Sequence, residues 1–263
     1  MSDDGVRAAT YQLVISVDAR RSGEYDDGDK PELRKQLYHV VGPAFTKAGA
    51  QAADVHLEDR GDGILATVAA SVPPSALLGV WLVEVHERLR ASNRVLARPL
   101  GLRVGMHVGP VREDRWGVNG RAVDLACRLT DSQKARDVLD EARADLVCVV
   151  SDQLYEDAVS PGGWGIDPET YLSASVRAKE GVVTAWFHLP GRGRPLKDVP
   201  PGVSPGWPPD PAPLPEGPSA PAETRFTAAR DVHHHDAPVY RAPVHFGDNH
   251  TGPAPRRGEA GDE

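Results

Sequence analysis

The chain has 263 residues, a formal net charge of −8 and 24 prolines, of which 16 lie at or after Pro190. An acidic chain without a clustered basic face is unsuited to binding nucleic-acid backbones. No stretch reaches the roughly 18 uninterrupted apolar residues of a membrane span, and the N-terminus lacks a signal-peptide pattern. We therefore predict a cytoplasmic protein with neither nucleic acid nor membrane as a partner. Its two cysteines, Cys127 and Cys148, suit buried positions in a reducing compartment.

Composition divides the chain into four parts. We expect a flexible N-terminus at residues 1–9, one folded domain at 10–190, a proline-rich linker at 191–230 and a flexible, disordered tail at 231–263. The tail histidines could gather a transition metal or belong to solvated low-complexity sequence. The tail segment VYRAPVHFGDNHTG is a short β-prone motif that loosely resembles amyloid-type signalling motifs, with a docking peptide or no function as alternatives.

Hydrophobic periodicity predicts alternating strands and helices within the folded domain. Short apolar runs predict strands at residues 11–17, 55–58, 64–72, 100–108, 144–150 and 182–189. Helical spacing behind start signals predicts helices near residues 31–49, 73–89, 122–129 and directly after 151. Gly109 and Pro110 are expected to end the fourth strand. This order predicts an α+β fold with a ferredoxin-like (palm-type), largely antiparallel sheet and helices packed on one face.

Two aspartates stand at the ends of predicted strands, beside turns that contain glycine. Asp18 ends the first strand, and Asp62 lies at the tip of the hairpin formed around residues 59–63. Carboxylates brought together from adjacent strands can hold two Mg²⁺ ions, which activate a hydroxyl group and bind a polyphosphate. Taken singly, each aspartate also fits a turn former or a helix cap.

Five segments, in order, resemble the class III nucleotidyl (adenylate/guanylate) cyclase catalytic domain of bacteria. These segments are VISVDARRSG, EDRGDGILATV, LRVGMHVGPV, GVNGRAVDLACRL and VRAKEGVVTAWF. The resemblance implies a nucleotidyl cyclase that converts a nucleoside triphosphate into its 3′,5′-cyclic monophosphate and pyrophosphate, in signalling or defence. It also implies a homodimer whose sites are built across the interface of two chains.

The resemblance assigns roles residue by residue. It makes Asp18 and Asp62 the ligands of two Mg²⁺ or Mn²⁺ ions. It places the triphosphate on the backbone of the loop at residues 19–23, where the residues concerned are Ala19, Ser22 and Gly23. It makes Lys179 a phosphate contact and Arg128 the group that stabilises charge on the transferring phosphoryl group. Lys179 also fits a solvated surface residue, and Arg128 a structural salt bridge.

One position departs from the family pattern. Where active members place an asparagine that donates to the ribose, this chain has Asp124, and an ionised carboxylate cannot donate a hydrogen bond. Either Asp124 is protonated or turned away in a working enzyme, or catalysis has been lost. In the latter case the chain would be an inactive, cyclase-like module that binds nucleotide and dimerises, while its C-terminal tail recruits a signalling protein.

Two further positions, Glu58 and Gly117, bear on which base the nucleotide substrate carries. Glu58 stands where guanylate cyclases of the family carry glutamate, and it could accept from the guanine N1–H and exocyclic amine. Its partner position is Gly117, which offers no side chain. Glu58 also fits an exposed strand residue, and GTP, ATP, UTP and CTP all remain open as substrates.

Overall fold

The structure, a computed structural model, describes residues 8–178 and 181–192. The predictions made for the first seven residues, for Lys179 and for residues 193–263 lie outside this part of the chain. Among the described residues, no helix combines the length and apolar composition that a membrane crossing requires.

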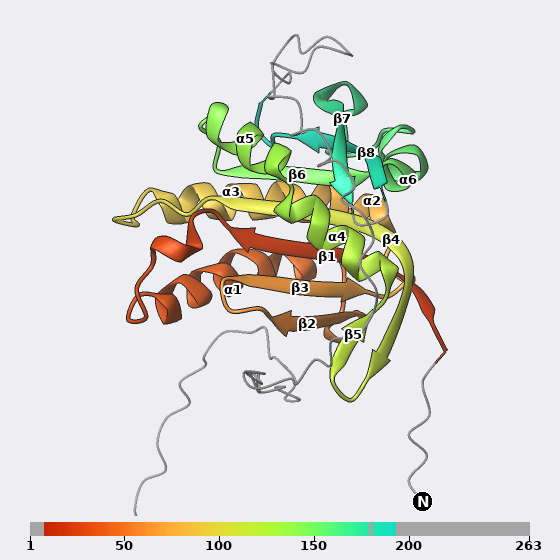
Figure 1. Cartoon of the computed structure of the whole chain (residues 1–263), viewed down its shortest axis with the longest axis horizontal. Helices are drawn as coiled ribbons and strands as arrows, with labels where there is room; N and C mark the ends of the chain where they lie inside the picture. Colours follow the sequence, from red (N-terminus) through yellow and green to blue (C-terminus); the bar gives the residue numbers. More distant parts are fainter. Residues whose placement is uncertain (1–7, 179–180, 193–263) are drawn as a thin grey trace, which may run out of the picture.

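The described residues form one mixed, eight-stranded sheet with helices on both faces (Figure 1). Its strands are β1 (Thr10–Ala19), β2 (Val55–Asp59), β3 (Gly63–Val68), β4 (Leu102–Asp114), β5 (Gly117–Asn119), β6 (Leu146–Ser151), β7 (Tyr171–Ala178) and β8 (Gly181–His188). The longer helices are α1 (Lys30–Lys47), α3 (Leu82–Asn93), α4 (Arg121–Asp131) and α5 (Gln133–Glu141). Short helical segments are η1 (Ser22–Glu24), α2 (Pro74–Ala76), η3 (Leu77–Trp81), α6 (Asp152–Leu154) and η4 (Tyr155–Val159).

The strand order is β2-β3-β1-β4-β6-β8-β7, and β5 pairs with β4 outside this path. The strands and longer helices from β1 to β4 form a βαββαβ unit, which consists of β1, α1, β2, β3, α3 and β4. Within this unit the order β2-β3-β1-β4 is antiparallel throughout, as in ferredoxin-like folds. The predicted α+β, ferredoxin-like fold is therefore confirmed. Only β6 runs parallel to its neighbour β4 among the described strands.

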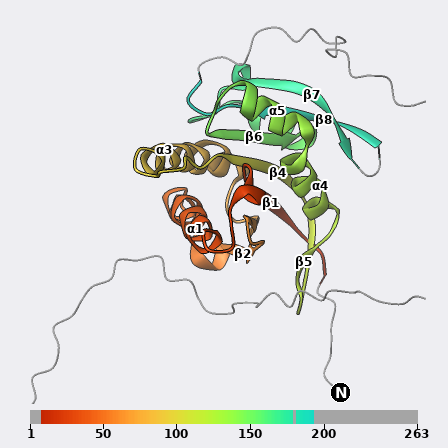
Figure 2. The same ribbon diagram turned by 60° about the vertical axis from the view of Figure 1, so that its left-hand side comes forward.

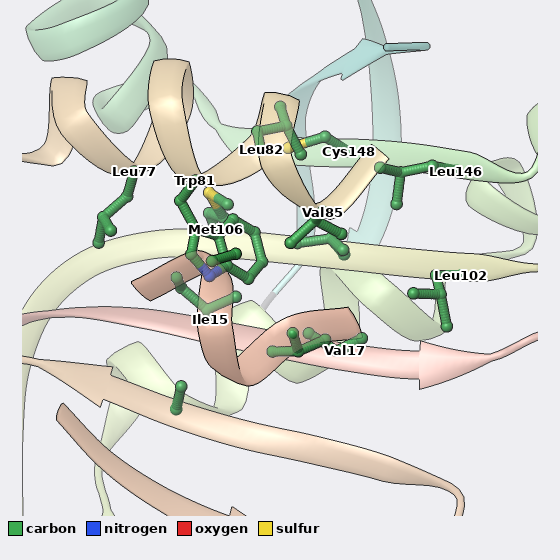
Figure 3. Close-up of a cluster of buried hydrophobic side chains, with 14 of the residues drawn as sticks. Ile15, Val17, Leu77, Trp81, Leu82, Val85, Leu102, Met106, Leu146 and Cys148 are labelled. Atoms are coloured by element: carbon green, nitrogen blue, oxygen red, sulfur yellow. The ribbon is translucent and has the colours of Figure 1, made fainter. Parts of the chain in front are cut away.

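The first face of the sheet packs against α1 and α3. Ile15 and Val17 of β1 and Met106 of β4 point towards this face. They pack against Trp81 of η3 and Val85 of α3 (Figure 3). The Phe45 ring of α1 lies 5.3 Å from the Trp81 ring, which joins the two helices over this face. Because alternate residues of a strand point to opposite faces, the uninterrupted apolar run of β1 must be covered on both sides.

The second face is covered by α4, which was predicted near residues 122–129, and by α5, although helices were expected on one face only (Figure 2). Helix α4 lies directly on the sheet, because a Cβ atom on Gly105 would come within 2.3 Å of the Ala126 carbonyl oxygen. The Thr130 hydroxyl also donates to the Ser16 carbonyl across 3.1 Å. The expectation of helices on one face is thus corrected: β1, β4 and β6 are buried on both sides.

Several element boundaries also differ from expectation. Strand β4 continues through Gly109 and Pro110, curves away from the sheet and forms a projecting hairpin with β5 (Figure 1). Its pairing with β6 ends at Met106, so Pro110 lies where that edge of β4 is free and a missing N–H is tolerated. Helix α5 and strand β7 were not predicted from periodicity. Strand β8 is the penultimate strand, with β7 at the edge.

Candidate active site

The sheet brings Asp18 and Asp62 together at the ends of neighbouring strands. Asp18 pairs in register with Gly63, the residue after Asp62, and the Ala19 N–H donates to the Asp62 carbonyl across 3.1 Å. The close approach requires glycine at position 63, because a Cβ atom there would lie 2.4 Å from the Val17 carbonyl oxygen. Two carboxylates predicted as a pair therefore lie side by side at one end of the sheet.

The pKa of Asp18 is shifted by burial and by neighbouring charges. Burial raises its pKa to about 6, the adjacent Arg103 guanidinium acts to lower that pKa, and the Asp62 carboxylate acts to raise it. Arg103 forms an ion pair with Asp18, and its side chain is only 9% exposed. The Nε of Arg103 is buried and donates to no residue in the described part of the chain. A buried cation with a spare donor thus stands beside the two carboxylates.

The loop after β1 presents backbone donors next to Asp62. Arg21 has φ of 55°, a left-handed conformation that turns the chain into η1, and the Ser22 hydroxyl donates to Asp62 Oδ2 across 2.5 Å. Within the described residues, the N–H groups of Arg21, Ser22 and Gly23 make no hydrogen bond to protein. Successive free N–H groups in a turn suit an anion. The Ala19 N–H, by contrast, already donates to the Asp62 carbonyl, and the contact of Ala19 with phosphate stays a prediction.

Glu58 and Gly117, the two residues predicted to lie at the base, are in contact. A Cβ atom on Gly117 would lie 2.4 Å from Glu58 Oε1, and the φ of 126° at this residue also favours glycine. Glu58 accepts hydrogen bonds from the Val118 N–H across 2.6 Å and from Arg60 across 2.7 Å. Burial alone would raise the pKa of Glu58, but hydrogen bonds from His56 and Val118 hold it below its ordinary value. Glu58 is therefore a fixed, ionised acceptor.

Helix α4 carries Asp124 and Arg128 one turn apart on the same side. Asp124 is exposed and Arg128 is half-buried. The side-chain partners of Asp18 and Asp62 among the described residues are Arg103 and Ser22. Within a single chain Arg128 therefore makes no direct contact of this kind with the two aspartates. Lys179 is not among the described residues.

The donor set at this end of the sheet fits Mg²⁺ or Mn²⁺. The described residues contain no cluster of three or more His, Cys, Asp or Glu side chains that could enclose a metal alone. Mg²⁺ is commonly held by one or two carboxylates, with substrate phosphates and water completing its coordination. Asp18 and Asp62 would supply those carboxylates, and the adjacent loop faces the place where phosphates would have to lie.

No role was predicted for Arg103, although it lies in the segment LRVGMHVGPV. The signal was present, since Arg103 is a single charge inside the apolar run LGLRVGMHV. A charged residue in a buried strand requires a partner, because an unpaired buried charge is costly. The partner, Asp18, lies 85 residues away in the sequence and is found only in the fold.

The fold is that of the catalytic domains of adenylyl and guanylyl cyclases. The guanylyl cyclase Cya2 matches with a TM-score of 0.51 and 15% identity, over 73% of this chain and 98% of that one. An adenylate/guanylate cyclase/hydrolase from Silicibacter pomeroyi matches with a TM-score of 0.50 and 18% identity, over 69% and 98%. A bacterial light-regulated adenylyl cyclase matches with a TM-score of 0.50 and 13% identity, over 69% and 51%. No family model and no curated protein matches the chain.

Proposed function

We propose that this protein is a nucleotidyl cyclase, which converts a nucleoside triphosphate into its 3′,5′-cyclic monophosphate and pyrophosphate in bacterial signalling or defence. The observation that carries the proposal is the adjacency of Asp18 and Asp62 beside a loop whose N–H groups at residues 21–23 donate to no residue in the described part of the chain. Paired carboxylates for divalent cations and backbone donors for anions are together the requirements of a polyphosphate site. The cyclase-type fold of the domain agrees with this chemistry.

Each group in the site has a physical role in this reaction. Asp18 and Asp62 would hold two Mg²⁺ or Mn²⁺ ions, which when bound supply charge neutralisation and activation of the 3′-hydroxyl. The N–H groups of residues 21–23 orient the triphosphate. Arg103 would exchange its ion pair with Asp18 for a phosphate oxygen, because a carboxylate that binds a cation no longer requires the guanidinium. The reaction thus relies on positioning and electrostatic stabilisation.

A second copy of the chain would complete each site. Within one chain the side-chain partners of Asp18 and Asp62 are Arg103 and Ser22, and Arg128 forms no hydrogen bond or ion pair with any described residue. A homodimer in which α4 of one protomer faces the aspartates of its partner would bring Arg128 to the transferring phosphoryl group. Lys179 of the chain would contact the phosphates in the same assembly.

The base would be recognised at Glu58. Three donors fix its carboxylate against Gly117: Oε1 accepts from His56 and Val118, and Oε2 accepts from Arg60, which leaves Oε2 a second lone pair for a ligand. An ionised acceptor matches the N1–H and exocyclic amine of guanine better than the acceptor-rich edge of the other bases. GTP is therefore the first substrate to test, followed by ATP, UTP and CTP.

The proposal is tested by incubating the purified full-length chain with each of the four triphosphates and Mn²⁺ and analysing the products by mass spectrometry. We expect a cyclic monophosphate and pyrophosphate from at least one of them. Asp62→Asn should abolish the product, whereas Asp157→Asn, which removes an equally exposed carboxylate from η4, should not. The absence of cyclic product from all four triphosphates would contradict the proposal.

Asp124 supports a second candidate, an inactive module that binds nucleotide and dimerises. Its carboxylate is exposed on α4, and an ionised group at this position would repel a triphosphate. Asp124→Asn discriminates between the two functions in the same assay. A large gain in product would indicate a site that Asp124 silences, and a loss would show that Asp124 takes part in an active enzyme. Bound nucleotide without product in both forms would favour the inactive module.

A further inference from the structure

The connection between α3 and β4 (residues 94–101) lies against the loop that follows β1 (residues 20–25). Two hydrogen bonds close the connection on itself. The Leu100 N–H donates to Asn93 Oδ1 across 2.8 Å, and Asn93 Nδ2 donates to the Leu100 carbonyl across 2.9 Å. The Leu100 side chain is buried in the core of the first face. The connection is therefore a well-fixed support for side chains that extend from it.

Arg98 extends from this support and makes three contacts with the loop. Its Nη2 donates to Glu24 Oε2 across 2.6 Å, and its Nη1 donates to the Glu24 carbonyl across 3.2 Å. Its guanidinium carbon lies 4.0 Å from the centre of the Tyr25 ring. A guanidinium makes both kinds of contact at once, because its donors lie in its plane and its flat face stacks on an aromatic ring. Arg98 thus holds two successive residues of the loop.

Few other hydrogen bonds attach this loop to the domain. The Arg20 N–H donates to a carbonyl of the same connection across 2.7 Å, and the Ser22 hydroxyl donates to Asp62. In the part of the chain that the structure describes, Arg98 supplies the only hydrogen bonds between residues 23–25 and elements outside the loop. The end of the loop therefore depends on Arg98 for its polar attachment.

The turn between these attachments is intrinsically unfavourable. Arg21 has φ of 55°, a left-handed conformation that a residue with a side chain rarely adopts. Such a conformation persists where the surrounding contacts hold it in place. If they were lost, the loop would sample other conformations, and a ligand would have to restore the order when it binds.

We propose that Arg98 is a positioning residue, which holds residues 21–23 in the conformation that turns their N–H groups towards the place of the triphosphate. The inference rests on the proposed function for what the loop binds, whereas the attachment of the loop by Arg98 requires no ligand. Arg98 itself would touch neither substrate nor metal. Its effect would pass through Glu24 and Tyr25 to the turn that precedes them.

Backbone hydrogen exchange in the full-length protein tests the attachment without a ligand. The Glu24 and Tyr25 N–H groups are bonded within the loop, across 3.0 and 3.1 Å, so their exchange reports its opening. Arg98→Gln should make this exchange about fivefold faster, the effect of losing one partly exposed ion pair and one cation–π contact. Equal exchange in the variant and the unmodified chain would overturn the proposal.

Arg94→Gln is the matched control for the exchange experiment. Arg94 caps the end of α3 in the same connection, is exposed, and its side chain forms no hydrogen bond or ion pair with a described residue. The control should exchange as the unmodified chain does. A rise equal to that of Arg98→Gln would show that any loss of charge in the connection loosens the loop, and would overturn the specific role of Arg98.

A kinetic measurement connects the attachment to the site. If a triphosphate is turned over, Arg98→Gln should raise its KM about threefold to fivefold with kcat nearly unchanged, because a disordered loop weakens binding in ground and transition states alike. A residue that only stabilised the fold would reduce the fraction of active protein, which lowers the apparent kcat and leaves KM unchanged. Arg98→Lys keeps the charge without the planar fork and should recover part of the effect.

The outcomes separate this proposal from the proposed function. An unchanged KM in Arg98→Gln would overturn the positioning role and leave the cyclase function standing. If no triphosphate is turned over, the cyclase function fails, and the exchange comparison still decides whether Arg98 holds the loop. Circular dichroism of each variant establishes that the fold is retained.

Discussion

Asp18 carries opposing electrostatic influences, because burial and Asp62 disfavour its charge while Arg103 favours it. Burial prevails and the pKa rises to about 6, compared with the ordinary 3.8 that applies in the unfolded chain. Between these values the folded state holds a proton that the unfolded state has lost. The free energy of unfolding therefore falls as pH increases from about 4 to about 6.

We expect Asp18→Asn to remove this pH dependence. In EDTA, the free energy of unfolding of the variant should increase relative to the unmodified chain by about 2–3 kcal/mol between pH 4 and pH 7. Arg103 loses its partner in the variant, but this shifts the whole curve by a constant, since arginine stays charged throughout. Urea unfolding at several pH values measures the difference. Parallel curves for the two proteins would contradict a raised pKa at Asp18.

At the scale of elements, the β7–β8 hairpin contains a half-buried histidine, His188. His188 of β8 stacks on the Tyr171 ring at 4.6 Å, and its Nδ1 lies 3.0 Å from the Thr170 hydroxyl. Burial lowers the pKa of His188 to about 4, from an ordinary value of 6.5. The neutral ring is therefore favoured in the fold. The contribution of the neutral His188 ring to the free energy of unfolding is complete above pH 6.5 and is lost as pH falls towards 4.

His188→Gln should accordingly flatten the acid side of the stability profile. The glutamine keeps a polar group near Thr170 but takes up no proton, so the loss of about 3 kcal/mol between pH 6.5 and pH 4 should disappear. The variant is expected to be less stable at neutral pH, because it loses the ring stacked on Tyr171. The measurement is again urea unfolding across the pH range. An identical acid loss in the variant would show that another group is responsible.

Helix α5 shows how an element missed by periodicity can contribute to a site. Its Ser132 cap accepts from the Ala135 N–H across 3.2 Å, and Ala135 and Leu139 are fully buried on the second face. Ser132 followed by these apolar residues at helical spacing is a recognisable helix start. The segment is short and mostly charged, so its single apolar stripe gives a weak signal. Its position over the sheet is what brings Asp140 within 3.5 Å of Arg20 in the loop that follows β1.

At the scale of the whole molecule, the hydrophobic clusters of the described chain are built from residues between Leu13 and Leu189. The proline-rich sequence beyond residue 192 offers few apolar side chains and many positions that cannot donate a backbone hydrogen bond. The domain boundaries drawn from composition remain predictions, as do the homodimer and a partner for the tail.

We expect a chain that ends at Arg192 to retain its fold. Its melting temperature should stay within about 2 °C of the full-length value, since a change of 1 kcal/mol corresponds to roughly 2–4 °C for a domain of this size. Differential scanning calorimetry of both proteins provides the comparison. A fall well beyond this range would show that the C-terminal segment contributes to the core.

The sequence by itself determined what is local. Runs such as YQLVISV predicted strands, proline and glycine marked helix ends, and a hairpin around Asp62 next to a strand ending at Asp18 predicted the carboxylate pair. These signals succeed because backbone propensity and side-chain alternation act over a few residues. The same reasoning ended β4 too early at Gly109, because a free strand edge cannot be recognised from neighbouring residues.

Only the tertiary structure decided which distant residues meet. Arg103 reaches Asp18 across 85 positions of sequence, and Arg20 reaches Ala144 across 124. Strand order and helix packing create these contacts, and periodicity carries no information about either. The second helical layer was missed for a related reason: a continuous apolar strand shows that both faces are buried without showing what covers them. The charge of a site is a sum over such contacts, so it is a property of the fold.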